Sequence, residues 1–170
     1  MNPFVVNVAD LLDRPGARRR ERVEGRLAGP ITVVDSAIRS DAPVVVDTLL
    51  EWVSDGLLAT GTVDAAWEGP CRRCLGPVRG ELHVGFQELF ERKPRDGESY
   101  PLGHHTVDLE PLAREALTLD LPLAPLCSPE CRGLCATCGA DLNLGDCGCP
   151  PADADPRWAA LDTLRLVADE

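Results

Sequence analysis

The sequence predicts an α+β fold, in which an antiparallel, β-rich core with a cysteine-containing hairpin precedes a short helix, a cysteine-rich C-terminal arm and a final helix. Three observations lead to this prediction. Apolar, β-branched segments separated by turn signals fill residues 4–90. Two later segments carry helix start signals. Six of the eight cysteines lie within residues 127–149. A chain of 170 residues is also long enough to bury a core.

The strands of the core are expected in the first half of the chain. Residues 4–12 are apolar and predict a strand that runs into a short helical turn, which Pro15 stops. Four further segments have the composition or the alternation of strands: residues 31–38, 44–53, 57–68 and 78–90. Because residues 69–77 are bounded by Gly and Pro on both sides, they are expected to form the turn between the last two strands.

Two segments further along the chain predict helices. Asp108 can cap a helix over residues 109–118, because Pro111 falls in the first turn, where its missing N–H costs little. In the same way, Asp155 can cap a final helix over residues 157–168. Residues 127–149 lie between these helices and contain too few apolar side chains for a core of their own.

The eight cysteines fall into four short-spaced pairs. These pairs are Cys71 with Cys74, Cys127 with Cys131, Cys135 with Cys138, and Cys147 with Cys149. The chain starts without a signal-peptide pattern and has no long apolar run, so we expect a cytoplasmic, reducing setting without membrane contact. Disulfides rarely persist there, and four such pairs are what two tetrahedral four-cysteine sites require. The sequence therefore predicts two Zn(II) ions per chain, although four thiolates also suit iron. The hairpin that carries Cys71 and Cys74 is accordingly expected to be a zinc knuckle.

Two divisions of the cysteines are open. In the first, Cys135, Cys138, Cys147 and Cys149 close locally on one ion, and Cys71, Cys74, Cys127 and Cys131 join the hairpin to the arm. In the second, the four cysteines of residues 127–138 share an ion, and the outer pairs share the other. Loop closure costs least in the first division, which we favour. The expected domains are a β-rich core over residues 1–126 and a zinc-stabilised arm and helix, packed on that core, over residues 127–170.

The charge distribution limits the partners that the chain can have. The formal net charge of −11 repels bulk phosphate and weighs against a general nucleic-acid binder. The exceptions are basic residues, which we take as candidate contacts for nucleic acid or another partner: Arg18, Arg19, Arg20, Arg22, Arg72 and Arg73. A charged face exposed to solvent is the alternative interpretation of the first four.

Four strings stand out in the C-terminal two-thirds: CRRCLGP at residues 71–77, LPLAPLC at 121–127, CRGLCATCGADLN at 131–143 and DPRWAAL at 155–161. Together they resemble the YceD-like family of large ribosomal RNA subunit accumulation proteins. The resemblance implies a role in accumulation or processing of large-subunit ribosomal RNA, and hence in ribosome assembly. It carries over no enzymatic activity and no RNA-contacting residue.

A non-enzymatic ribosome-assembly factor is therefore the leading hypothesis. Four thiolates leave no open position on a metal, and no phosphate loop or hydrolase motif is present, so we expect no catalysis and no small-molecule substrate. The partner would be a ribosomal RNA precursor or a basic large-subunit ribosomal protein, which the acidic chain attracts. The alternative is a thiol redox or zinc-release sensor, because Arg72 and Arg73 lie beside Cys71 and Cys74. A DNA-binding zinc ribbon is disfavoured by the acidic charge.

Overall fold

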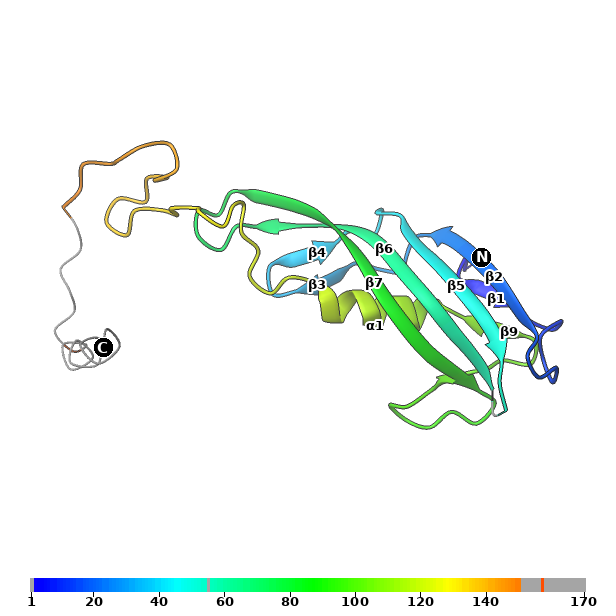
Figure 1. Ribbon diagram of the computed structural model, residues 1–170. Coiled ribbons are helices and arrows are strands. Elements are labelled where there is room, and N and C mark those ends of the chain that lie inside the picture. Colours follow the sequence, from blue (N-terminus) through cyan, green and yellow to red (C-terminus); the bar gives the residue numbers. More distant parts are fainter. Residues whose placement is uncertain (1, 55, 151–156, 158–170) are drawn as a thin grey trace, which may run out of the picture.

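The computed structural model describes residues 2–54, 56–150 and 157, and this part of the chain is mostly antiparallel β-sheet with one helix (Figure 1). The strands are β1 Val5–Asn7, β2 Arg18–Gly25, β3 Ile31–Val33, β4 Ser36–Ile38, β5 Val44–Trp52, β6 Leu57–Pro70, β7 Pro77–Glu91, β8 Tyr100–Pro101 and β9 Thr106–Asp108. The helix α1 spans Glu110–Asp120. The predicted β-rich core with a short helix is thus confirmed. Within the described residues, no helix is long and apolar enough to cross a membrane.

One large sheet holds most of the strands, in the order β2-β5-β6-β4-β3, with β7 also paired to β6 and β8. Its longest element is the β6–β7 hairpin, which is paired without interruption from Leu57 opposite Phe90 to Pro70 opposite Pro77. The cysteine turn of residues 71–76 closes this hairpin, and the C-terminal arm continues outward from the same end of the molecule (Figure 1).

The core lies between one face of the sheet and α1, which Figure 1 shows running along that face. Alternate residues of β5 and β6 point into it, as their burial patterns show. Leu112 and Leu117 of α1 are fully buried, and the helix contacts β3, β6 and β7. The helix begins one residue later than predicted, because its N-cap is Leu109, which makes no side-chain capping hydrogen bond. Asp108 precedes the cap, and its carboxylate accepts the N–H of Glu110 at 3.0 Å.

Two predicted elements differ from the structure. The single strand expected over residues 31–38 is a pair of short strands, β3 and β4, because Val34 has a φ of 55° and reverses the chain. The arginine-rich segment, for which no strand was predicted, forms β2 and pairs with β5 along its whole length. The predicted final helix over residues 157–168 lies, apart from its first residue, outside the described residues.

Candidate metal centres

The turn at the end of the β6–β7 hairpin brings two cysteines to one point. The N–H of Cys71 donates to the carbonyl of Gly76 at 2.7 Å, and the N–H of Leu75 donates back to the carbonyl of Cys71 at 2.9 Å. This pair of hydrogen bonds closes a tight loop in which Cys71 is fully buried and Cys74 is half-buried. The flanking strands therefore fix both sulfur atoms on the same side of the turn.

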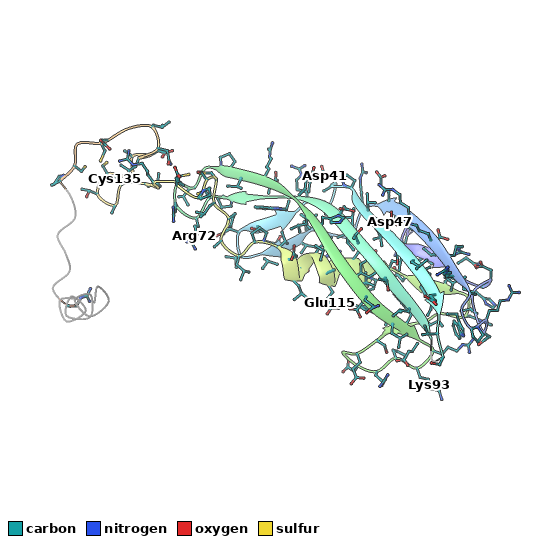
Figure 2. The ribbon with its side chains drawn as sticks, viewed as in Figure 1. Asp41, Asp47, Arg72, Lys93, Glu115 and Cys135 are labelled. Atoms are coloured by element: carbon teal, nitrogen blue, oxygen red, sulfur yellow. The ribbon has the colours of Figure 1, made fainter. Side chains whose placement is uncertain are left out.

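A second turn in the arm repeats this pattern of hydrogen bonds. The N–H of Cys135 donates to the carbonyl of Ala140 at 2.8 Å, and the N–H of Gly139 donates to the carbonyl of Cys135 at 2.9 Å. Figure 2 places Cys135 in the arm, beyond the hairpin end that carries Arg72. The two C-x2-C segments thus have the same local backbone fold although one lies between strands and the other lies in irregular chain.

The structure gathers the eight sulfur atoms into two sets of four. The first set contains Cys71, Cys74, Cys127 and Cys131, and within each set all sulfur atoms lie within 4.8 Å of one another. The distance from Sγ of Cys71 to Sγ of Cys131 is 3.8 Å, and that from Cys74 to Cys127 is 3.7 Å. A zinc ion bound at about 2.3 Å from four sulfurs would separate them by about 3.8 Å, whereas a disulfide bond is about 2.05 Å long. The first set therefore fits a tetrahedral metal ion.

The second set contains Cys135, Cys138, Cys147 and Cys149. It is more accessible than the first, because none of its cysteines is buried and Cys138 is exposed. Both groupings agree with the division that loop closure favours. They could hold metal ions, and binding by these residues stays a prediction.

Polar hydrogens surround the sulfurs of the first set. The backbone N–H of Arg73 donates to Sγ of Cys71 at 3.4 Å, and the side-chain amide of Asn143 donates to Sγ of Cys131 at 3.4 Å. Asn143 also accepts the backbone N–H of Arg132 at 2.8 Å, which fixes its amide in this orientation. Asn143 was not among the predicted site residues. The sequence feature that could have indicated this contact is the position of Asn143 in the loop between the two cysteine pairs of the second set.

The thiols within each set influence one another strongly. Hydrogen bonds from the backbone N–H groups of Cys74, Cys127 and Arg73 lower the pKa of the Cys71 thiol to about 6. The neighbouring Cys131 and Cys74 thiols raise the pKa of Cys127. Some thiols thus ionise readily, and their charge suppresses ionisation of the others. A divalent cation at the centre would allow all four thiols to ionise, because its charge offsets their mutual repulsion.

The second set has the same asymmetry. The backbone N–H groups of Cys138 and Thr137 lower the pKa of Cys135 to about 6, and the neighbouring Cys138 and Cys147 thiols raise the pKa of Cys149. The electrostatic argument for a cation therefore applies to both sets.

Hydrogen bonds to backbone carbonyls join residues 125–131 to the hairpin end independently of any metal. The guanidinium of Arg73 donates to the carbonyls of Pro129 and Cys131 at 3.0 and 2.9 Å, and the N–H of Arg72 donates to the carbonyl of Pro125 at 2.9 Å. A Cβ on Gly133 would lie only 3.1 Å from the carbonyl oxygen of Arg73, so the close approach favours glycine there. Arg73, a candidate partner contact, is thus engaged within the chain.

The arginine stretch of β2 is divided between two sides of its strand. Arg19 is tied to Asp10 and Glu21. The arginines that alternate with it on the exposed side are Arg18, Arg20 and Arg22. Asp47 of β5 accepts two hydrogen bonds from Arg20, at 2.8 and 3.1 Å, and its carboxylate lies 3.7 Å from Arg22. The side chains of these two arginines remain 76% and 64% exposed, so they keep contact surface for a partner.

Comparison with known proteins places these features in context. A family model described as large ribosomal RNA subunit accumulation protein YceD matches residues 59–165. An uncharacterized protein of Mycobacterium tuberculosis is 37% identical over 96% of this chain and 86% of its own length. The large ribosomal RNA subunit accumulation protein YCED homolog 1, chloroplastic, of Zea mays is 38% identical over 82% of this chain and 59% of its own length. YlbN of Bacillus subtilis is 26% identical over 82% of this chain. No solved structure matches the chain.

Proposed function

The chain belongs to the YceD family, and on this premise we propose that it is a non-enzymatic, zinc-binding factor for accumulation of large-subunit ribosomal RNA and ribosome assembly. The family is named for RNA accumulation and not for a reaction. The observation that carries the zinc assignment is the spacing of 3.7–3.8 Å between sulfur atoms of the first set. Four thiolates would close each site, so the metal would act on structure and leave no position for a substrate.

The first set of cysteines would hold the arm in place. Two of its ligands come from the hairpin, at Cys71 and Cys74, and two from the arm, at Cys127 and Cys131. Structural zinc contributes on the order of 10–16 kcal/mol in small zinc-dependent peptides, so the arm would depend on the metal for its fold. We propose on this basis that residues 1–126 form the core domain and residues 127–170 form a zinc-stabilised arm.

Metal analysis tests the zinc assignment directly. Native mass spectrometry of protein purified without chelator is expected to give two zinc ions per chain. Iron bound to four thiolates would instead show as coloured protein with visible absorbance. A single metal ion, or none, together with free or oxidised thiols would overturn the assignment.

Co-sedimentation tests the role in assembly. The protein is expected to travel with particles that contain the precursor of the large ribosomal subunit. The arginine contribution is tested by changing Arg18, Arg20 and Arg22 together to Gln. Arg19 is kept, because it anchors Asp10 and Glu21. A control variant loses the same charge elsewhere on the surface, at Arg39, Arg79 and Arg95. Equal co-sedimentation of both variants would show that the arginines of β2 do not contribute to binding of the particle.

A redox or zinc-release sensor is a second candidate, favoured by the accessibility of the second set of cysteines. Zinc ligation would protect the thiols from alkylation until a chelator is added. Rapid loss of zinc from the second set under mild oxidation, with disulfides forming between Cys135, Cys138, Cys147 and Cys149, would favour the sensor. Slow alkylation and unchanged zinc content would count against it.

A further inference from the structure

A groove of about 290 Å³ lies between α1 and strand β7. It is on the β7 side of the β6–β7 hairpin, whereas β5 pairs with the β6 side. Figure 2 shows Glu115 on α1 beside this strand. The apolar part of the lining comes from Val84 and Phe86 of β7 and from Leu112, Ala116 and Leu119 of α1. Leu119 is 81% exposed, which is unusual for a large apolar side chain next to a groove.

The edge of β7 beside this groove is open. Within the described residues, β7 pairs with β8 only at Phe90 and Glu91, and otherwise only with β6. The described backbone hydrogen bonds outside the sheet ladders also leave residues 78–89 without a partner on that side. Alternate peptide groups of an edge strand point away from its neighbour, and an extended chain can pair with them. The groove therefore combines apolar side chains with a backbone template.

Three carboxylates form the polar part of the lining together with Gln87 and Tyr100. Glu88 occupies the inward-facing row of β7, between Phe86 and Phe90, and is half-buried there. Glu115 and Asp120 of α1 line the same groove. In the part of the chain that the structure describes, no basic side chain lies within ion-pair distance of these three carboxylates, although Tyr100 donates a hydrogen bond to Glu115. Burial and the charge of Glu115 raise the pKa of Glu88. A cationic side chain between them would relieve this repulsion.

We propose that the groove between α1 and β7 binds an extended, basic segment of a protein partner, which adds to the edge of β7. Its apolar side chains would rest on Phe86, Ala116 and Leu119, and a Lys or Arg would lie between Glu88 and Glu115. RNA is a poor occupant, because phosphates would meet uncompensated carboxylates in a chain of net charge −11. That the partner is a large-subunit ribosomal protein rests on the proposed function.

A peptide-binding experiment tests the groove with the full-length, metal-loaded protein. The probe is a short fluorescent peptide in which valine alternates with lysine or arginine, followed by fluorescence anisotropy. Changing Glu88 and Glu115 together to Gln is expected to weaken binding about tenfold. The matched control is Glu81→Gln, which removes a charge from the opposite face of the same strand. A peptide with two consecutive prolines at its centre loses N–H donors on both sides of the strand, so it cannot pair with β7 and should not bind.

A second pair of variants tests the contribution of apolar side chains to peptide binding. Leu119→Ala is expected to weaken binding about threefold or more, whereas Leu144→Ala, which trims a leucine that is 89% exposed in the arm, should leave binding unchanged. Both leucines are exposed, so neither change should unfold the protein.

Three results would overturn the proposal: equal binding by the groove variants and their controls, equal binding of the proline peptide, or preferential capture of an RNA oligonucleotide by the groove. A homodimer that the Leu119 variant disrupts would also overturn it, because the occupant would then be a second copy. If the peptide fails to bind while co-sedimentation with ribosomal particles persists, only the groove is wrong. If the peptide binds but co-sedimentation fails, the proposed function is wrong.

Discussion

Leu75 and Gly139 occupy equivalent positions in the two C-x2-C turns, and both have a positive φ, of 60° and 73°. In each turn this residue donates its N–H to the carbonyl of the first cysteine at 2.9 Å. Glycine adopts this conformation freely, whereas a residue with a Cβ loses roughly 1–2 kcal/mol. The hairpin turn therefore contains backbone strain that the arm turn avoids.

The variant Leu75→Gly is expected to stabilise the hairpin turn by up to about 1 kcal/mol, because relief of the strain exceeds the added freedom of glycine in the unfolded chain. The measurement is the urea midpoint of the metal-loaded protein, together with the rate of zinc loss to a chelator. Gly139→Leu is the reciprocal change and should speed zinc loss from the arm. A lower midpoint for Leu75→Gly would show that the leucine side chain, although 65% exposed, makes contacts that outweigh the strain.

Removal of one cysteine from each set should separate the two sites. Cys71→Ser is expected to release one zinc ion and to increase hydrogen exchange in the arm, while the local turn at Cys135 keeps its metal. Cys135→Ser should release the other ion and leave the hairpin end protected. Native mass spectrometry and peptide-resolved hydrogen exchange measure both effects. Loss of both metals from either variant would contradict the division into two independent sets.

Gly61 should be intolerant of any side chain, because β5 and β6 approach closely at this position. A Cβ there would lie 2.0 Å from the carbonyl oxygen of Asp47 and 2.7 Å from Cα of Thr48. Gly61→Ala is expected to lower the free energy of unfolding by about 2–4 kcal/mol. The control is Gly85→Ala in β7, where a Cβ would lie 4.0 Å from the carbonyl oxygen of Gly61 and the change should stay within about 0.5 kcal/mol. Similar urea midpoints for the two variants would be inconsistent with this account.

Glu88→Gln should stabilise the protein near neutral pH. The folded state raises the pKa of Glu88 through burial and repulsion by Glu115, so it favours the protonated form. Glu88 therefore contributes stability below its ordinary pKa, and this contribution is lost as the pH rises through the raised value. The advantage of the Gln variant, measured from urea midpoints, should shrink in mildly acidic buffer. Glu81→Gln again serves as the control, and a constant advantage across this range would refute the assignment.

Much of the fold follows from local patterns in the sequence. The strands β5, β6 and β7 were predicted to within a few residues, because apolar side chains alternate along them and Gly or Pro marks their ends. The start of α1 was predicted because Asp108 and Pro111 are residues that begin helices. Short cysteine spacings and loop closure likewise predicted the two sets of four sulfurs.

The features that were missed depend on tertiary contacts. Strand β2 consists mainly of Arg and Glu and carries little apolar signal, so its strand character comes from the ladder with β5 and the ion pairs to Asp47. The reversal between β3 and β4 uses Val34, a residue that rarely adopts a positive φ. The sequence suggests that Arg73 is an exposed cation. Only the folded arm brings the carbonyls of Pro129 and Cys131 within hydrogen-bond distance of it.

The uninterrupted β6–β7 hairpin also sets the distance between its two ends. Its fourteen paired residues in β6 span about 45 Å at roughly 3.3 Å per residue. The cysteine sets lie beyond one end of this ladder, and the carboxylates of Glu88 and Glu115 lie towards the other. A particle component held at the hairpin end and a peptide held beside α1 would therefore be kept at a fixed separation.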